Sequence, residues 1–382
     1  MTNILAISHT FIPSVLMCAH KQLEYLQTNK DINYQFCLYN KVTDKLLNWA
    51  DIVIFVRSES GMDEDVSRLC KKANKHMVYV LDDDLPNAPD GLSSSHYYLR
   101  PEVKEWIKNT MANCTTFLTP SPVLLEKYGG GFKNKFLIKE PSLGIIENKK
   151  ENNKVKIGFA GSIDRAQDVN EILEGALIRI IEKYGDSIEI EFMGGKPEIV
   201  DKYNLSYVPY ESSYETYAKT LRERNWDIGL APMPDTPFHN CKYINKYVEY
   251  ASAGIVGIYS NVKPYTFGIR NEENGLLVDN NTDKWVEAIS RLIEDKKLRE
   301  KISNNCLKEA KEVYSLEVVA EDYYNKIMVD YVKQPESNIR GTLAAKIRLL
   351  NYTIVYKFRL HGWDFPRWAI HRAYEKFILH KD

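Results

Sequence analysis

The sequence lacks several features that would assign it at once to a common class of protein. Its 382 residues include only six cysteines, and none belongs to a CxxC pair. Disulfide frameworks and zinc sites need paired or clustered cysteines. We therefore expect buried, reduced thiols at every cysteine: Cys18, Cys37, Cys70, Cys114, Cys241 and Cys306.

Long apolar runs and a strong charge imbalance are absent too. No segment reaches the roughly 18–20 apolar residues that cross a bilayer. Residues 1–20 carry no Lys, Arg, Asp or Glu, but a basic start is missing and polar residues with Pro13 interrupt the apolar run, which disfavours a signal peptide. The net charge of −1 argues against nucleic acid as a partner. We expect a cytoplasmic protein.

The sequence does contain a regular alternation of short apolar runs and amphipathic stretches. Strands are predicted at 4–8, 34–39, 51–56, 77–82, 116–119 and 135–138, and again at 155–161, 188–193, 227–231, 255–259 and 276–278. Helical patterns occupy 15–27, 102–111, 122–128, 169–184, 213–224, 244–253, 282–294 and 298–313. Such alternation predicts parallel sheets covered by helices on both faces.

A polar break divides this pattern into two series. Residues 147–154 read ENKKENNK and contain no apolar side chain, which is typical of a linker. We therefore predict an α/β protein with two doubly wound, Rossmann-like domains, an N-terminal one at 1–146 and a C-terminal one at 155–315. Residues 316–382 are expected to form C-terminal helices and a tail that packs back on the first domain.

The tail has a composition of its own. Residues 335–382 hold nine Lys or Arg against four Asp or Glu, and aromatic side chains are interleaved with them. A packed helix with solvated charges is one interpretation. A peripheral contact with the anionic inner face of a membrane is the other, and the sequence leaves both open.

The first candidate site is the segment GFAGSIDRAQD, residues 158–168. A strand, a Gly-Ser turn and a helix start would present backbone N–H groups to an anion, and Gly161 would let a phosphate approach the backbone. Ser162, Arg165 and Asp168 belong to the same segment. It fits neither GxGxxG nor GxxxxGK[ST], so nicotinamide and ATP-loop sites are unsupported and no cofactor is expected.

The second candidate site lies in the segment from 227 to 254. Lys242, Lys246 and Glu249 are spaced at i, i+4 and i+7, which places them on one face of a helix expected to begin near Lys242. Two cations at a helix start oppose its dipole unless an anion sits there. The alternative is a Lys-Glu surface network; the unfavourable placement of the lysines makes us prefer the anion site.

These motifs resemble the donor half of GT-B glycosyltransferases of family 4, in particular bacterial enzymes of surface-polysaccharide assembly. The resemblance rests on FAGS at 159–162 with Asp168, DIGLAP at 227–232, the FxNxK…KxxEY pattern from 238 to 250, and NGLLVDN at 274–280. It covers about residues 155–330 well. Over residues 1–145 it is weaker, and VYVLDDDL at 78–85 is the main shared feature.

The resemblance implies two facing domains with a nucleotide-diphosphate sugar in the cleft, and transfer with retention. We expect a glycan, lipid-linked or surface-polymer acceptor, and no metal is required if lysines and a helix start neutralise the phosphates. It implies that Glu249 accepts hydrogen bonds from the ribose and that Gly161 and Ser162 lie near the phosphates. The first glutamate of the family's pair would fall at Cys241, and of the usual basic pair only Arg165 is nearby. We infer that Lys242 and Lys246 supply the missing charge.

In the first domain, residues after predicted strands are candidates for the acceptor side. His9 follows the first strand and is either a catalytic or a capping histidine. Asp82 and Asp83 stand in a run of three carboxylates, which is either a polar site or an acidic turn. His96 lies in a loop that we place on the acceptor side by position alone.

Two other functions stay open at this level. A nucleotide-sugar 2-epimerase would use the same fold and donor without an acceptor. A non-catalytic, donor-binding partner subunit of another transferase is the second alternative, because Cys241 replaces a glutamate of the family pattern.

Overall fold

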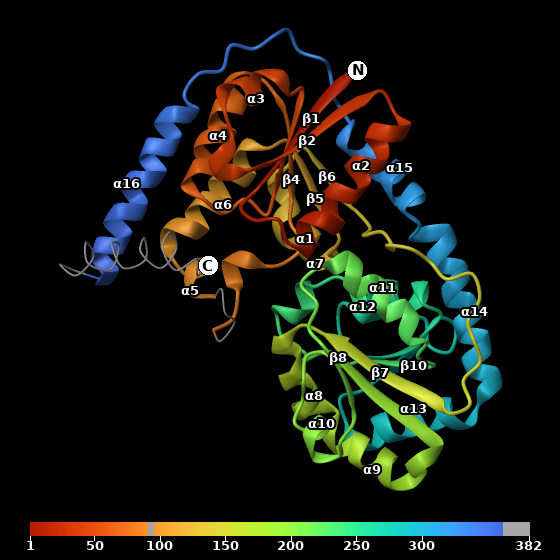
Figure 1. Ribbon diagram of the computed structural model, residues 1–382. Coiled ribbons are helices and arrows are strands. Elements are labelled where there is room, and N and C mark those ends of the chain that lie inside the picture. Colours follow the sequence, from red (N-terminus) through yellow and green to blue (C-terminus); the bar gives the residue numbers. More distant parts are fainter. Residues whose placement is uncertain (91–94, 362–382) are drawn as a thin grey trace, which may run out of the picture.

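The computed structural model describes residues 1–90 and 95–361. Two six-stranded sheets, each entirely parallel, form two domains stacked one above the other (Figure 1). Helices cover both faces of each sheet, so the central strands are buried on both sides and consist of nearly continuous apolar residues. The predicted fold class, two facing Rossmann-like domains with C-terminal helices, is confirmed.

The N-terminal sheet has the strand order β2-β1-β3-β4-β5-β6. Its strands are β1 (Thr2–Ser8), β2 (Ile32–Leu38), β3 (Ile52–Val56), β4 (His76–Val80), β5 (Thr116–Thr119) and β6 (Asn134–Leu137). Its helices are α1 (Pro13–Val15), continued by a π-helical turn over Leu16–His20, α2 (Lys21–Asn29), α3 (Asp44–Trp49), α4 (Gly61–Lys72), α5 (Ser95–Tyr98), α6 (Pro101–Asn113) and α7 (Pro122–Tyr128).

The C-terminal sheet has the order β12-β11-β10-β7-β8-β9. Its strands are β7 (Val155–Gly161), β8 (Ile188–Gly194), β9 (Ser206–Pro209), β10 (Ile228–Ala231), β11 (Val256–Ser260) and β12 (Leu276–Val278). Its helices are α8 (Ala166–Ile172), α9 (Glu174–Tyr184), α10 (Ile199–Lys202), α11 (Tyr214–Arg224), α12 (Asn245–Ser252), α13 (Thr282–Glu294) and α14 (Lys296–Val313).

Each predicted strand is present with small shifts at its ends, but several elements were missed. The edge strand β9 is short and half exposed, so it lacks a continuous apolar run. Helix α4 was missed although a capping box at Ser60 and Asp63 begins it. The helix expected at 169–184 is divided at Leu173 into α8 and α9.

The strand order determines where a ligand fits. In each sheet the chain winds first in one direction and then in the other, and the reversal leaves a crevice at the carboxyl ends of two central strands. These are β1 and β3 in the first domain and β7 and β10 in the second. The two crevices face each other, so the carboxyl edges of both sheets meet at the domain interface (Figure 1).

The C-terminal helices connect the second domain back to the first. Helix α15 (Leu316–Ile327) packs on α2, and its Ala320, Tyr323 and Ile327 share an apolar cluster with the first sheet. Helix α16 (Thr342–His361) then lies along α4 (Figure 1). The remainder of the predicted tail, residues 362–382, lies outside the described residues.

The segment 147–154 is not a free linker, although its composition predicted one. The Lys149 ammonium donates to the carbonyl oxygens of Trp226 and Gly254, the latter at 3.0 Å, and burial lowers its pKa to about 8. Asn152 donates to Asp227 at 2.9 Å. A polar run can therefore dock on a domain when its side chains reach strand and helix ends that carry unpaired acceptors.

The cysteines lie where the sequence predicts buried thiols. All six cysteines are buried and free. Within residues 1–90 and 95–361, no helix is both long and apolar enough to cross a membrane.

The packing of Gly158 on Trp226 gives a test of the second core. Trp226 is 1% exposed and donates its indole N–H to Glu191 at 2.8 Å, while Gly158 in β7 leaves space for the ring. A methyl group at Gly158 would overlap the indole. We expect Gly158→Ala to lower the free energy of unfolding by at least about 1–3 kcal/mol, measured by urea titration of tryptophan fluorescence.

Gly130→Ala is the matched control, because no atom lies within 4 Å of the position its β-carbon would take. Its free energy of unfolding should change by less than about 0.5 kcal/mol. Equal stability of the two variants would contradict the packing described for Trp226.

Candidate functional site

A pocket of about 230 Å³ lies where the carboxyl edges of the two sheets meet. Residues from the first domain, from the connection after β6 and from the second domain all line it. Most of the residues predicted from sequence are among them: Asp82, Asp83, Gly161, Ser162, Arg165, Lys242, Lys246 and Glu249. The structure thus brings together segments that are up to 167 positions apart in the chain, because each follows the carboxyl end of a central strand.

On the first-domain side, Arg57 organises the acidic turn after β4. Its guanidinium donates to Asp82 at 2.6 Å and to Asp83 at 3.2 Å. Arg57 directly follows β3 and has a left-handed backbone (φ 49°), an uncommon conformation for an arginine. Such a backbone conformation persists where surrounding contacts hold the residue in place. Here the two ion pairs of Arg57 with Asp82 and Asp83 hold it.

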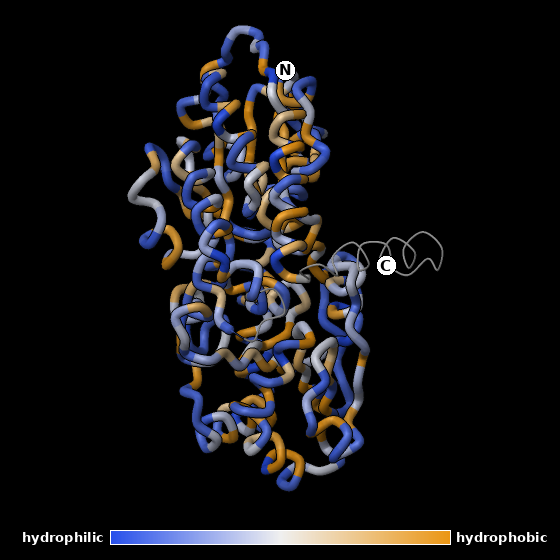
Figure 2. Tube along the Cα trace, turned by 90° about the vertical axis from the view of Figure 1, so that its left-hand side faces the viewer, coloured by the Kyte–Doolittle hydropathy of each residue, from blue (hydrophilic) through white to orange (hydrophobic). Residues whose placement is uncertain are grey.

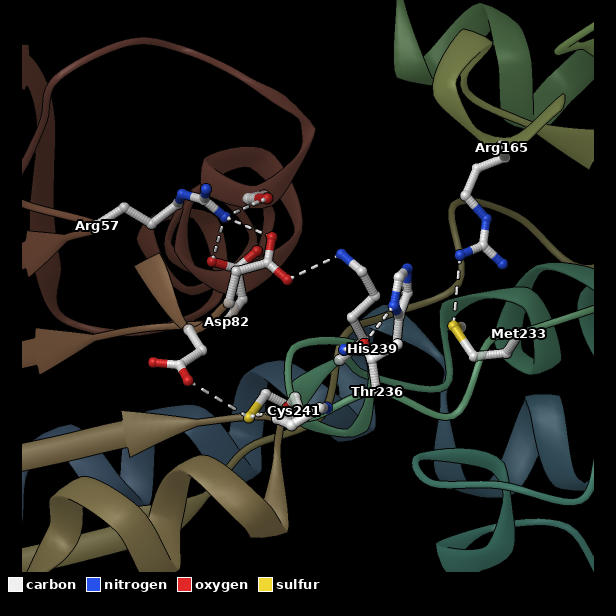
Figure 3. Close-up of polar contacts among 12 residues, drawn as sticks. Arg57, Asp82, Arg165, Met233, Thr236, His239 and Cys241 are labelled. Atoms are coloured by element: carbon white, nitrogen blue, oxygen red, sulfur yellow. Dashed lines mark hydrogen bonds and ion pairs between the residues drawn. The ribbon is translucent and has the colours of Figure 1, made fainter. Parts of the chain in front are cut away.

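Asp83 also reaches across the interface to Lys242, whose ammonium lies 3.1 Å from its carboxylate (Figure 3). Burial alone would raise the pKa of Asp83, but Lys242 and Arg57 outweigh it and lower the pKa to about 2. The carboxylate is therefore charged at every physiological pH, and it holds Lys242 at the mouth of the pocket.

The predicted helix start is wrong in its detail. Helix α12 begins at Asn245, and Lys242 follows a single 3-10 turn over His239–Cys241. Lys242 and Lys246 therefore do not share a helix face. Lys242 instead extends toward the first domain, where its ammonium pairs with Asp83.

The third acidic residue of the turn has separate partners. Asp84 is 2% exposed and accepts hydrogen bonds from Lys127 at 2.6 Å and Tyr128 at 2.5 Å. The thiol of Cys241 lies 3.9 Å from the same carboxylate, across the interface (Figure 3). A glutamate at this position would bring a second carboxylate against Asp84, so the substitution at Cys241 suits the facing surface.

On the second-domain side, the turn after β7 supports the pocket wall. Gly194 at the end of β8 has a left-handed backbone (φ 87°), and the N–H of Gly195 donates to the Gly161 carbonyl at 2.9 Å. Any β-carbon at Gly194 would overlap that carbonyl oxygen. Two glycines after β8 therefore let the neighbouring turn close tightly on Gly161 and Ser162.

Arg165 crosses the gap between the two central strands of this sheet. One terminal nitrogen donates to the Pro232 carbonyl at 2.5 Å, and Nε lies 2.9 Å from the carboxylate of Asp168. The other terminal nitrogen contacts the Met233 sulfur at 3.3 Å (Figure 3). Burial raises the pKa of Asp168, and Arg165 opposes that shift. Asp168 thus orients Arg165 and does not itself line the pocket.

Glu249 on α12 is 9% exposed, and its carboxylate accepts hydrogen bonds from three side chains. Tyr214 donates to one carboxylate oxygen at 2.9 Å, whereas Tyr217 at 2.7 Å and Lys246 at 2.5 Å donate to the other. Both tyrosines belong to α11, and the sequence offered no signal for them beyond their aromatic character. The pair Lys246–Glu249 is i, i+3 on one helix, the spacing that brings side chains together.

Glu140 is a site residue that sequence reasoning missed. It lies after β6, lines the pocket and is 3% exposed. Burial, followed by the nearby charge of Asp82, raises its pKa to about 8, and the Cys18 thiol donates to it at 3.3 Å. Its side chain is therefore neutral at pH 7 and adds no charge to the pocket.

His9 and His96 are not part of this pocket. His9 stacks on Tyr39 with ring centroids 4.3 Å apart, and its Nδ1 lies 3.8 Å from the carboxylate of Glu59. Burial lowers the pKa of His9 and raises that of Glu59 to about 7. His96 is exposed on the short helix α5.

One segment of the chain matches the model of a known protein family. Residues 246–309, from α12 to α14, match the family model of glycosyl transferases group 1. This segment includes Lys246 and Glu249. No curated protein sequence matches the chain.

Solved structures share the whole two-domain fold at low sequence identity. HepE of Anabaena in complex with UDP superposes with a TM-score of 0.59 at 11% identity, over 86% of this chain and 100% of HepE. A Listeria monocytogenes protein classified as a candidate UDP-N-acetylglucosamine 2-epimerase gives 0.57 at 11% identity, over 87% and 98%. TarM of S. aureus gives 0.54 at 13% identity over 80% of this chain, which spans only 57% of TarM's length.

These likenesses extend over both sheets and the interface between them. The chain therefore has the GT-B fold, and the segment of it that matches a family model, residues 246–309, is similar to glycosyl transferases group 1.

Proposed function

We propose that the protein is a glycosyltransferase that moves a sugar from a nucleotide-diphosphate donor, with retention, to a glycan, lipid-linked or surface-polymer acceptor. The observation that carries the proposal is the convergence of Lys242, Lys246 and Arg165 with the Gly161–Ser162 turn on one interdomain pocket. The family match over α12 to α14 and the UDP bound to HepE support a nucleotide-sugar donor.

The donor's diphosphate would lie between the turn after β7 and the lysines. Backbone N–H groups of the turn and the guanidinium of Arg165 offer oriented donors, and the two ammonium groups add charge. Lys242 would exchange Asp83 for a phosphate oxygen, since both ligands are anions within reach of its flexible stem. Asp83 retains Arg57 after that exchange.

Glu249 would bind the ribose hydroxyls of the donor. A carboxylate that already accepts from Tyr214, Tyr217 and Lys246 has a fixed orientation, which lowers the entropic cost of binding the sugar. Lys246 therefore has two roles in this proposal, holding Glu249 and facing the phosphates.

Catalysis would rest on charge stabilisation at the leaving diphosphate. As the glycosidic bond lengthens, negative charge grows on the phosphate while the sugar becomes oxocarbenium-like. Lys242 and Arg165 would stabilise the first change more strongly than they bind the intact donor. Lys242, Lys246 and Arg165 offer the leaving diphosphate positive charge, and Asp82 and Asp83 are already paired with cations. We therefore propose transfer without a metal.

The acceptor would approach from the first domain. We propose His9, the acidic turn at Asp82 and Asp83, and His96 as candidates for the acceptor side, because all of them belong to the first domain. Protons lost by the acceptor hydroxyl would pass to the leaving phosphate. The same fold and donor would also serve an epimerase, which the first assay below distinguishes by product.

The function is tested by incubating the pure protein with UDP-sugars and measuring UDP release in the presence of EDTA. We expect slow release with at least one UDP-sugar, because water replaces the acceptor, and no dependence on magnesium or manganese. Release of the donor's free sugar without epimerisation supports transfer. Release of an epimerised sugar would instead show that the protein is an epimerase. Measurable UDP affinity without turnover would indicate a non-catalytic, donor-binding subunit.

Lys242→Met tests the phosphate contact directly. A lost charge-assisted hydrogen bond is worth about 1.5–3 kcal/mol, so we expect UDP affinity to fall at least about tenfold by calorimetry. Asp83 would also lose its partner Lys242, and its negative charge would then weaken UDP binding further. Lys308→Met is the matched control, since its side chain is 73% exposed on α14, away from the pocket. Unchanged affinity with a lower melting temperature would show that Lys242 only joins the domains.

Glu140 predicts a pH dependence of donor binding. Its folded pKa of about 8 lies above the usual 4.5, so its ionisation disfavours the folded state progressively from about pH 4.5 to pH 8. Above about pH 8 the ionised carboxylate would also repel the diphosphate. UDP affinity should therefore decrease between pH 7 and 9 in the parent and less in Glu140→Gln, which keeps an acceptor for Cys18. Parallel pH profiles would contradict this role.

A further inference from the structure

A half-buried histidine, His239, lies at the edge of the interdomain pocket. The two domains lie one above the other in both views of the molecule (Figures 1 and 2), and His239 belongs to the loop of the second domain that faces the first. Figure 3 shows its ring between Arg165 on one side and the acidic turn at Asp82 on the other. His239 is therefore close to the place where the donor's diphosphate is proposed to bind.

The orientation of the imidazole is set by Thr236. The Thr236 hydroxyl oxygen accepts from the backbone N–H of His239 at 3.2 Å and lies 2.8 Å from Nδ1 of the ring. Because that oxygen already accepts one hydrogen bond, its proton is free to point at Nδ1, and the neutral ring then carries its own proton on Nε2. Among the residues that the structure describes, none forms a hydrogen bond with Nε2, which points away from Thr236 in Figure 3.

The loop that carries His239 is held firmly on the second domain. The backbone N–H of Met233 donates to Ser260 at 2.8 Å, and Asn280 donates to the Met233 carbonyl at 2.8 Å. Three prolines fix backbone φ angles along the same loop: Pro232, Pro234 and Pro237. The position of the imidazole is thus determined before a ligand arrives, as a binding group requires.

Three charged groups act on the ring: Arg165 from the turn after β7, Lys242 from its own loop, and Asp83 from the first domain. Burial, followed by the charges of Arg165 and Lys242, lowers the pKa of His239 to about 4. Asp83 opposes this shift. In this arrangement of charges the imidazole is neutral at pH 7. An anion placed between the two cations would compensate their charge and favour the imidazolium.

We propose that His239 binds the donor's diphosphate through Nε2 and takes up a proton from solvent as the diphosphate binds. The incoming proton would add to Nδ1, which would then donate to Thr236 as the hydroxyl turns away, so the contact with Thr236 persists in both states. The imidazolium would be a third positive charge beside Arg165 and Lys242. This inference rests on the proposed function, because it takes the diphosphate as the ligand.

The proton would matter most when the sugar leaves. The bond between the anomeric carbon and the phosphate oxygen breaks, and that oxygen keeps the electron pair, so the diphosphate gains negative charge. An imidazolium hydrogen-bonded to it stabilises the leaving group more than the intact donor. Donor binding and transfer are therefore coupled to the protonation of one side chain.

The inference is tested by calorimetry of UDP binding to the full-length chain at pH 6, in buffers of different ionisation enthalpy. If the pKa of His239 in the complex returns to about 6.5, the parent takes up at least about half a proton per UDP more than His239→Gln does. Glutamine offers an N–H in place of Nε2–H but does not titrate. The terminal phosphate of UDP also titrates near pH 6, and its contribution is common to both proteins.

Affinity gives a second readout on the same proteins. Relative to the parent, His239→Gln should bind UDP about fourfold more weakly at pH 6 and nearly equally at pH 8, since only the protonated histidine adds charge. His76→Gln is the matched control. His76 lies at the amino end of β4, the opposite edge of the sheet from the pocket, and burial lowers its pKa too. This control should keep the parent's proton uptake and affinity.

Equal proton uptake by the parent and His239→Gln would overturn the inference. So would a lower melting temperature of His239→Gln with parental UDP affinity at both pH values, which would make His239 a structural residue of the loop. A parent that binds no UDP would contradict the proposed donor site itself. The three results are distinct, so a failure of this inference is separated from a failure of the proposed function.

Discussion

The ion pair between Asp83 and Lys242 is the contact on which the arrangement of the site depends. It joins the carboxyl edge of the first sheet to the loop that follows β10 in the second. Asp83 is held in place by Arg57, whose own strained backbone directly follows β3. Charge is thus balanced across the interface without a ligand, and an anionic ligand can take the lysine while the arginine still compensates the aspartate.

Burial decides which other charges the pocket can hold. Glu249 has a fixed orientation because two tyrosines and Lys246 donate to it, whereas burial, followed by the nearby charge of Asp82, raises the pKa of Glu140 to about 8. Cys241 fits the same logic, since it faces the buried carboxylate of Asp84. The cysteine at this position is therefore matched to the opposing domain, and Lys242, Lys246 and Arg165 gather at one interdomain pocket.

The C-terminal helices have a structural role in addition to any surface contact. Helices α14, α15 and α16 lead the chain from the second domain back over the first, and α15 completes an apolar cluster there. The domains are consequently joined twice, by the segment after β6 and by this return.

The sequence by itself determined the two α/β domains, because buried parallel strands must be continuous apolar runs, and such runs are visible without a structure at β1, β7 and β10. It also determined that Lys246 and Glu249 are neighbours, since helical spacing is local. Only the tertiary structure decided that Lys242 pairs with Asp83, that Arg57 supports the acidic turn, and that Tyr214 and Tyr217 hold Glu249. These contacts join residues far apart in the chain, and their energy arises from the burial and opposing charge that folding creates.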